Sequence, residues 1–339
     1  MTNSFSQLIS EYSQKVQDNN ILDNNELSHL QLLLQEAFQV ALSNIDKDNL
    51  STLFNYFLHN DIQHSLIILL FSVRFKKKLI GWDNNSLCFL ADFWECIEQN
   101  LPLSHFEQNG FIKSIIVKDM DESLGQGDYV PSIKQIVLSY NMIINRPSDV
   151  VPMLLHEIGH AVRIMVNEDV IMSWFDSFGW HSFSDSLSGI NSWINLMGGW
   201  DNLTSLQQSE IITCIRQCFN SEKTFKQGPP PQNLYPGHPW ENFKVRDVYE
   251  KTFDYWFESL DESYKYNGYV FFFNFYYKKL MAVNLSTVEM IYDHEINRYA
   301  LMGREEFFAE LYSYYYDPYQ REKLVPNIQY WFHNHVDSV

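Results

Sequence analysis

The stretch LLHEIGHAVR, residues 154–163, says most about the fold and chemistry of this chain. It places His156 and His160 four positions apart, with Glu157 directly after the first histidine. Residues four apart share one face of an α-helix, so both imidazoles could bind a single zinc ion. Glu157 could then act as a general base towards the water that attacks a substrate. The alternative is that the two histidines only share a helix face.

The composition indicates a folded chain with a sizeable core. Phe, Tyr and Trp make up 16% of the 339 residues, far too much apolar material for a disordered protein. Acidic residues number 42 and basic residues 24, which gives a formal net charge of −18. This balance argues against nucleic acid as a partner, because phosphate binding needs a concentrated positive field. A basic protein or peptide partner is compatible with it, and the alternative is that the charge serves solubility alone.

The sequence predicts neither a membrane span nor a Sec-type signal peptide. The longest apolar run, LIILLFSV at 66–73, is too short for a bilayer, which needs about 20 residues. Residues 1–20 lack a charged start followed by an apolar core. The four cysteines match no CxxC pattern and are expected to be free thiols. We therefore expect a cytoplasmic protein, or one exported without such a signal, for example into a host cell.

Apolar spacing predicts a helical part followed by a mixed part. From residue 4 to about 101, apolar residues recur at spacings of three and four, which indicates a bundle of several helices. The break around Pro102 predicts a helical N-terminal domain at 1–110. The segments 112–120 and 134–143 are short and rich in β-branched residues, and therefore predict two strands joined by a loop.

The second predicted domain, 111–339, combines a small mixed sheet with an active-site helix and further helices. The predicted fold class is therefore α+β, mostly helical. A large insertion at about 167–284 is mostly helical in pattern and contains a proline-rich loop at 226–240. Towards the C-terminus, the apolar pattern predicts two helices, at 303–316 and 328–336.

A catalytic zinc site needs a third protein ligand, while one position stays open for water. The usual nearby positions do not provide it. Val166 stands where an HExxHxxGxxH motif has its third histidine, and Gly179 and Trp180 stand where other HExxH enzymes carry a glutamate. Other histidines lack a partner at helical spacing, and the reserve candidates are His181, His238 and His294, the last together with Glu295.

The strongest candidate for the third ligand lies in the segment 303–316. Glu306 and Glu310 stand four apart there and thus on one helix face. One carboxylate could bind zinc, while the other accepts a hydrogen bond from the free N–H of a ligating histidine. Alternatively, Glu305, Glu306 and Glu310 form the solvated face of a helix. The neighbouring apolar residues, which argue against a solvated face, are Phe307, Phe308, Ala309 and Leu311.

These motifs resemble a known group of peptidases. HEIGHAV, EFFAE and a tyrosine seven residues before the first glutamate of EFFAE together resemble the catalytic domain of anthrax lethal factor. The signature is similar to that of the clostridial Pro-Pro endopeptidases and, more loosely, of the Mlc titration factor A peptidases. The resemblance covers about 124–167 and 292–335, and the connection between the two motifs is much longer here than in that group.

The resemblance implies a zincin-like catalytic domain of the gluzincin kind. Carried over position by position, it makes His156, His160 and Glu306 the zinc ligands, Glu157 the base, Tyr299 the donor to the oxyanion, and Glu310 a carboxylate that orients a ligand. Zincins also bind their substrate along an exposed edge strand. The candidate strand here is 135–140, and an ordinary core strand is the alternative.

The predicted function is that of a zinc-dependent endopeptidase. It would hydrolyse a peptide bond in a specific protein substrate, as a secreted effector or toxin protease does. One alternative keeps the Zn²⁺ ion but makes the chain a hydrolase that matures a small peptide. Another makes it a non-catalytic, acidic, helical binding protein in which the HEIGH motif is coincidental.

Overall fold

The computed structural model describes residues 2–40, 45–60, 63–87, 89–120, 127–182, 200–202, 204–205, 269–274 and 279–339. The chain divides into two compact units, 1–165 with 312–339, and 166–311. The proline-rich loop at 226–240 and most of the predicted insertion lie outside the described residues. The domain boundary near residue 110 stays a prediction. Within the described ranges, every helix is too short or too polar to span a membrane.

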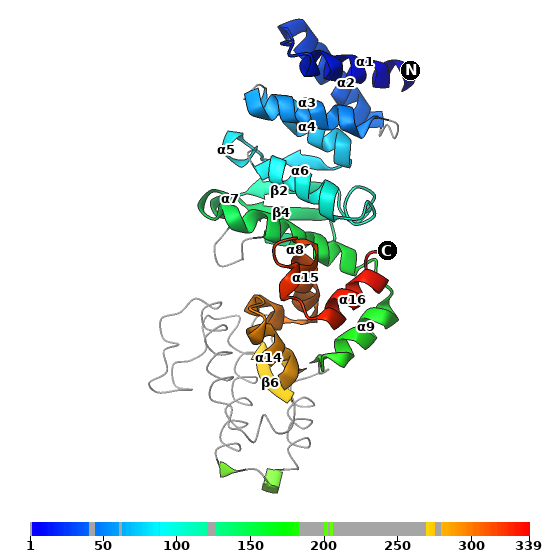
Figure 1. Cartoon of the computed structure of the whole chain (residues 1–339). Coiled ribbons are helices and arrows are strands. Elements are labelled where there is room, and N and C mark those ends of the chain that lie inside the picture. The colour runs from blue at the N-terminus through cyan, green and yellow to red at the C-terminus, as the bar shows by residue number, and fades with distance from the viewer. Residues whose placement is uncertain are drawn as a thin grey trace. The chain divides into compact units, whose positions relative to one another are not determined.

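Four helices open the first unit, in the part that the sequence predicts to be helical. They are α1 (Thr2–Gln17), α2 (Asn24–Val40), α3 (Lys47–Asn60) and α4 (His64–Phe75). Apolar residues at spacings of three and four are buried, for example Leu30 and Leu34 of α2 and Leu53 and Phe57 of α3. Helix α1 packs on α3, α3 on α4, and α4 on α2, as Figure 1 shows. The predicted helical N-terminal region is confirmed.

An aromatic cluster joins α3 and α4 to α6 (Phe89–Asn100). Trp94 of α6 stacks on Phe54, with 4.2 Å between the ring centroids, and meets Phe75 edge-on at 5.1 Å. Phe75 in turn contacts Phe106 at 5.8 Å. Such ring pairs contribute about 0.5–1.5 kcal/mol each beyond the area they bury. The helical region and the segment after α6 therefore share one core.

A small mixed sheet follows, with the strand order β1-β2-β4-β3. Its strands are β1 (Lys78–Ile80), β2 (Ser114–Lys118), β3 (Gly127–Val130) and β4 (Gln135–Ser139). The pairs β1·β2 and β2·β4 are parallel, whereas β3 runs antiparallel to β4. Ile136, Val137 and Leu138 of β4 are all buried, as expected for a central strand that is covered on both faces. The predicted fold class, mostly helical α+β with a small mixed sheet, is confirmed.

Two details of the predicted strands are wrong. The segment 135–140 is not an edge strand, because β4 pairs with β2 on one side and with β3 on the other. The edge strands of this sheet are β1 and β3. Strand β3, the edge strand next to β4, lies in the segment that the sequence predicts to be a loop. Tyr129 is the buried side chain of its four residues. A strand this short shows too little alternation of polar and apolar residues to be recognised from sequence.

The histidine motif lies on α8 (Val150–Arg163), as predicted. Strand β4 leads into α7 (Tyr140–Asn145), and a 3-10 turn, η2 (Pro147–Asp149), runs directly into α8. The residue at the N-cap position is Asp149, whose side chain makes no capping hydrogen bond. Pro152 falls in the first turn of α8, where the missing N–H breaks no helical hydrogen bond.

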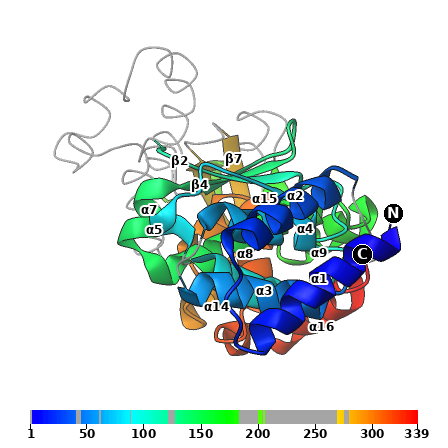
Figure 2. The same ribbon diagram turned by 90° about the horizontal axis from the view of Figure 1, so that it is seen from above.

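Helix α7 lies beside α5 (Asn84–Leu87), as Figure 2 shows. The Tyr140 hydroxyl donates to Asp83 Oδ2 at 2.9 Å, and Asn85 Nδ2 donates to the same hydroxyl oxygen at 3.1 Å. Asp83 Oδ1 also accepts from the backbone N–H groups of Asn85 and Ser86, at 3.1 and 3.0 Å. This network holds the start of α7, and hence the connection that leads to α8.

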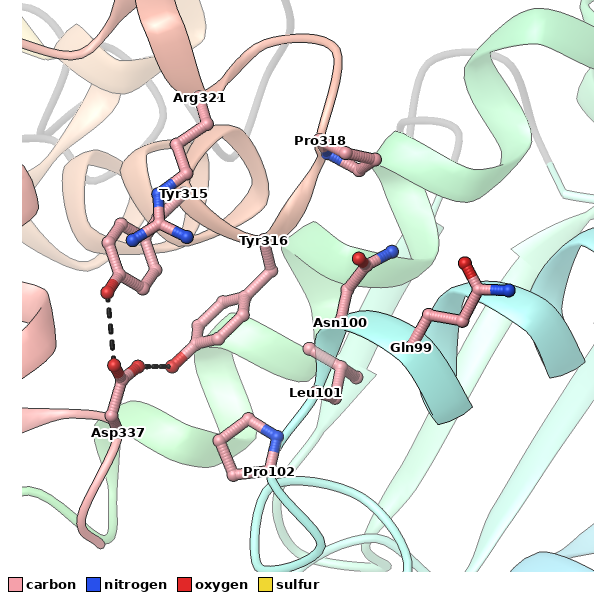
Figure 3. Close-up of a pocket in the computed structure, with 9 residues that line it drawn as sticks. All are labelled: Gln99, Asn100, Leu101, Pro102, Tyr315, Tyr316, Pro318, Arg321 and Asp337. Carbon is pink, nitrogen blue, oxygen red and sulfur yellow. Dashed lines mark hydrogen bonds between the residues drawn. The ribbon is translucent and has the colours of Figure 1, made fainter.

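The chain ends with α15 (Arg304–Tyr316), η7 (Arg321–Lys323) and α16 (Pro326–His335). The hydroxyls of Tyr315 and Tyr316 donate to the two carboxylate oxygens of Asp337, at 3.1 and 2.6 Å. Figure 3 shows both bonds beside a cavity of about 580 Å³. Burial raises the pKa of both hydroxyls, so they remain donors at neutral pH and hold the end of α15 to the C-terminal segment.

His105 is a second link between α15 and the C-terminal segment. It is fully buried, with Nδ1 3.0 Å from the Tyr312 hydroxyl and Nε2 2.8 Å from the carbonyl oxygen of Val336. Because a carbonyl can only accept, Nε2 carries the proton, and Nδ1 accepts from the tyrosine. Burial lowers the pKa of His105, which keeps the ring neutral.

The second unit contains α9 (Glu168–Ser177), β5 (His181–Ser182), η3 (Trp200–Asn202), β6 (Tyr269–Asn274), β7 (Lys279–Asn284), α14 (Leu285–Asp293), η6 (Arg298–Met302) and the first part of α15. Its strands form an antiparallel sheet in the order β5-β7-β6.

An aromatic cluster packs α9 against α15, because Phe307 contacts Trp174 at 5.5 Å and Phe178 at 5.1 Å. Gly179 follows with φ +73°, and a Cβ there would lie 2.2 Å from the Asn284 side chain. Only glycine fits at this turn.

We expect the free energy of unfolding to decrease as the pH drops below about 6.5, because of His105. The unfolded chain binds a proton near the ordinary pKa of about 6.5, whereas burial lowers the pKa of His105 in the folded chain. This contribution is present above that pH and is lost as the pH falls, at up to about 1.4 kcal/mol per pH unit. Urea unfolding at about pH 7.5 and about pH 5 measures it. His105→Gln cannot titrate in this window, so equal pH dependence of both proteins would contradict the assignment.

Candidate metal centre

Helix α8 presents the two histidines and Glu157 from a helix that the core fixes in place. Leu154, Leu155 and Ile158 are fully buried, so the apolar positions of α8 point into the core on more than one side. His156 and Glu157 are 8% and 5% exposed, and His160 is partly exposed. The polar residues of the motif are therefore largely withdrawn from water, which is costly unless they have partners.

The two imidazoles converge on one point. Nε2 of His156 lies 3.1 Å from Nε2 of His160, and the ring planes are 82° apart. Two nitrogens that bind one tetrahedral zinc ion at 2.0–2.1 Å would lie about 3.3 Å apart. The observed separation is close to this value, so the pair is arranged as two ligands of one ion would be.

The carboxylates of the second motif lie on a helix that is buried on every side. All residues of α15 from 306 to 316 are buried, and Glu306 and Glu310 are each 8% exposed. The side chain of Glu305, in contrast, is 43% exposed and pairs with Arg304 at 3.2 Å. The solvated-face alternative is therefore wrong for Glu306 and Glu310 and correct for Glu305.

A hydrogen bond links the last turns of α15 to the first turn of α8. Ser313 Oγ donates to the carbonyl oxygen of Pro152 at 2.8 Å. Two helical turns, about seven residues, lead back from Ser313 to Glu306, and the same number lead forward from Pro152 to Gly159, between the two histidines. Along each helix, therefore, Glu306 and the histidine pair lie about two turns away from this hydrogen bond.

His156, His160 and Glu306 together could hold a metal ion. One ligand atom from each residue can be chosen so that all three lie within 4.8 Å of one another. Two imidazoles and one carboxylate are a donor set that zinc accepts, with a fourth position left for water or substrate. Within the described ranges this is the group of His, Cys, Asp and Glu side chains that meets the condition. It corresponds to the three ligands predicted from sequence.

Glu157 lies against β3, one of the two edge strands of the sheet. A Cβ built at Gly127 of β3 would lie 2.8 Å from Glu157 Oε1 and 2.7 Å from Met153 Sδ. Real Cβ atoms do not approach other atoms so closely, so a larger residue would force both side chains to move. The absence of a side chain at Gly127 therefore lets β3 run directly past the carboxylate of Glu157.

Tyr299 and Glu310 are connected through a residue that the sequence-based prediction missed. Tyr299 is the second residue of η6 and is partly exposed. Its backbone N–H donates to Asn297 Oδ1 at 3.1 Å, and Asn297 Nδ2 donates to Glu310 Oε1 at 3.3 Å. A signal was available, because Asn is a preferred N-cap residue and this one directly precedes η6.

The reserve candidates do not join the metal-binding group within the described part of the chain. His294 ends α14 as its C-cap residue, and Glu295 follows in a left-handed turn at φ +52°. His238 and the side chain of His181 lie outside the described residues. Cys96 on α6 is buried and free, as predicted, while the other three cysteines fall outside the described residues.

Comparisons with models of protein families, with curated proteins and with solved structures found no match to this chain. The similarity to known proteins is therefore limited to the residues of the candidate site. The group of His156, His160 and Glu306 has the composition of an HExxH-type metal site, with two histidines four apart on one helix and a carboxylate from a distant helix.

We expect the purified protein to bind a single zinc ion and Glu306→Ala to weaken that binding strongly. Loss of a direct ligand should cost more than the roughly 10- to 100-fold that loss of an outer partner costs. The matched control is Glu305→Ala, because the Glu305 side chain is partly exposed and pairs with Arg304, and this variant should bind zinc as the wild type does. Elemental analysis and chelator competition measure both. Equal affinity of the two variants would show that Glu306 is not a ligand.

Proposed function

We propose that this chain is a zinc-dependent endopeptidase. The observation that carries the proposal is the approach of a buried glutamate on α15 to the histidine pair of an HExxH motif on α8. In this proposal His156, His160 and Glu306 bind Zn²⁺. The resemblance of HEIGHAV and EFFAE to the lethal factor group supports the same assignment and adds the roles of the remaining residues.

Each residue of the site then has a chemical task. Zinc, when bound, supplies a Lewis acid that lowers the pKa of water and polarises a peptide carbonyl. Glu157 takes a proton from the attacking water and passes it to the leaving amine. Tyr299 donates a hydrogen bond to the carbonyl oxygen as that oxygen becomes negative. Glu310 accepts from the free ring N–H of a ligating histidine and so fixes its orientation.

Strand β3 is the proposed site for the substrate backbone. Within the described strands it pairs with β4 on one edge only, so its other edge can accept an extended peptide as an added strand. Gly127 brings this strand next to Glu157. A peptide bound along β3 would therefore pass the base, which is what hydrolysis requires. This assignment replaces the predicted edge strand at 135–140.

The finer parts of the proposal follow from the resemblance and from the sequence pattern. They are a specific protein substrate, a role as an exported effector or toxin protease, and a catalytic domain at 111–339 that carries an insertion at 167–284. The acidic balance of the chain, with a formal net charge of −18, would favour a basic substrate segment through electrostatic steering.

We expect Glu157→Gln to bind zinc normally and to lose peptide hydrolysis. General acid and base catalysis contributes about 10²- to 10⁴-fold, and a neutral amide cannot accept the proton. A library of fluorescence-quenched peptides, followed by a search for new N-termini in a cell lysate, measures the activity. Cleavage of short peptides without any protein would favour the peptide-maturing alternative. A zinc-loaded wild type that cleaves nothing would overturn the proposal, and absence of zinc would favour the binding protein.

We also expect Gly127→Ala to lower hydrolysis much more than stability. The new Cβ would displace the carboxylate of Glu157, and misplacement of a catalytic group by about 1 Å can cost about 100-fold in rate. Both contacted atoms belong to flexible side chains, so the free energy of unfolding should change by no more than about 1 kcal/mol. The matched control is Gly110→Ala, where a Cβ meets nothing within 4 Å. Equal activity of the two variants would contradict the placement of Glu157.

A further inference from the structure

Asn297 uses both ends of its side-chain amide. The oxygen Oδ1 accepts from the backbone N–H of Tyr299 at 3.1 Å, and the nitrogen Nδ2 donates to Glu310 Oε1 at 3.3 Å. Its backbone oxygen also accepts from Ala300 N at 3.0 Å. One residue therefore begins the short helix η6 and ties it to α15.

The hydrogen bond from Asn297 to Glu310 joins η6 to α15, and these two segments must keep a fixed distance for the proposed chemistry. Glu310 stands one helical turn after Glu306 on α15, so a bond to Glu310 is a bond to the helix that carries the proposed zinc ligand. Tyr299 belongs to η6, a 3-10 helix of five residues, and 3-10 geometry is weak over such lengths. The Asn297 bridge sets the position of the tyrosine backbone relative to that ligand.

An oxyanion donor acts only when it is held in place before the reaction. A shift of about 1 Å in such a group can cost about 100-fold in rate, and donors of this kind are effective because they are preorganised. Ala300 and Leu301, the residues after Tyr299, are fully buried and hold one side of the segment. Asn297 supplies the restraint on the other side.

We propose that Asn297 is a positioning residue, which places Tyr299 relative to the metal-binding helix by bridging the Tyr299 backbone and the Glu310 carboxylate. This inference rests on the proposed function. An amide is suited to the task, because it accepts from the N–H and donates to the carboxylate at once. Aspartate would keep the first bond and oppose the second, while alanine would remove both.

Asn297 can be substituted without opening the core, because it is exposed. The matched control is Asn167, which caps α9 by accepting from Asp169 N at 3.0 Å and Val170 N at 3.2 Å. Asn167→Ala therefore removes the same kind of cap without touching Glu310. Any effect that Asn297→Ala has beyond this control belongs to the bridge.

The first test uses the metal-free protein and needs no substrate. Hydrogen exchange, followed by mass spectrometry of peptides that cover 298–303, should be faster by about tenfold or more in Asn297→Ala than in the wild type. Glu310→Ala should speed exchange in the same segment, because it releases the Asn297 side chain. Glu310→Gln keeps a side-chain oxygen and should exchange at nearly the wild-type rate. Unchanged exchange in both Asn297→Ala and Glu310→Ala would overturn the bridge.

The second test asks whether the bridge acts through Tyr299. With a quenched peptide that the zinc-loaded wild type cleaves, Asn297→Ala should lower kcat about tenfold and change KM less than twofold, as expected for an effect on the transition state alone. Asn167→Ala should leave kcat within twofold. In a Tyr299→Phe background the same Asn297→Ala change should lower kcat less than twofold, because residues that act together are not additive.

The outcomes distinguish a failure of this inference from a failure of the proposed function on which it rests. Faster exchange with a non-additive effect on kcat supports the positioning role. Faster exchange with fully additive effects, or with a change in KM alone, overturns it, because Asn297 would then act independently of Tyr299. A zinc-loaded wild type that cleaves no peptide overturns the proposed function and the catalytic purpose of the bridge together, and the exchange data would then report a purely structural link.

Discussion

Glu306 and Glu310 are carboxylates on a helix that water barely reaches, and the arrangement of the site depends on how they are satisfied. Burial of a charged group is costly unless cations or hydrogen-bond donors surround it. Asn297 donates to one of them, and the imidazoles of His156 and His160 lie beside the other. A metal ion at this point would offset the remaining cost. The same burial that is hard to explain for a structural helix is expected for a metal-binding one.

Helix α15 can carry such groups because both of its halves are anchored. In the first half, Phe307 packs among the aromatic residues of α9. In the second half, Tyr312 bonds to His105, Ser313 bonds to the carbonyl of Pro152, and the two following tyrosines bond to Asp337. These contacts fix the rotation of α15 about its own axis. A rotation of one residue, about 100°, would turn Glu306 away from the histidines.

The proposed base and the proposed oxyanion donor are positioned by different kinds of contact. The proposed base, Glu157, belongs to α8, and Gly127 brings the edge strand β3 against it. One close contact therefore sets both the proposed place for a substrate strand and the proposed proton acceptor. The proposed oxyanion donor, Tyr299, belongs to η6, and hydrogen bonds through Asn297 connect η6 to α15. Packing of large apolar residues thus holds α8 and α15, the helices of the candidate metal site, while a glycine and an asparagine position the groups around them.

The sequence alone determined the elements whose physics is local. The four-residue spacing of His156 and His160 places them on one helix face wherever that helix lies, and apolar spacing predicted α15 and the helical N-terminal region in the same way. Tertiary structure alone decided that Glu306 is buried while Glu305 is partly exposed. It also decided that β3 rather than β4 is an edge strand of the sheet, and that Asn297 reaches Glu310. These facts join residues far apart in the chain or depend on the rotation of a whole helix. Periodicity carries no information about either, because packing sets them only after the elements have formed.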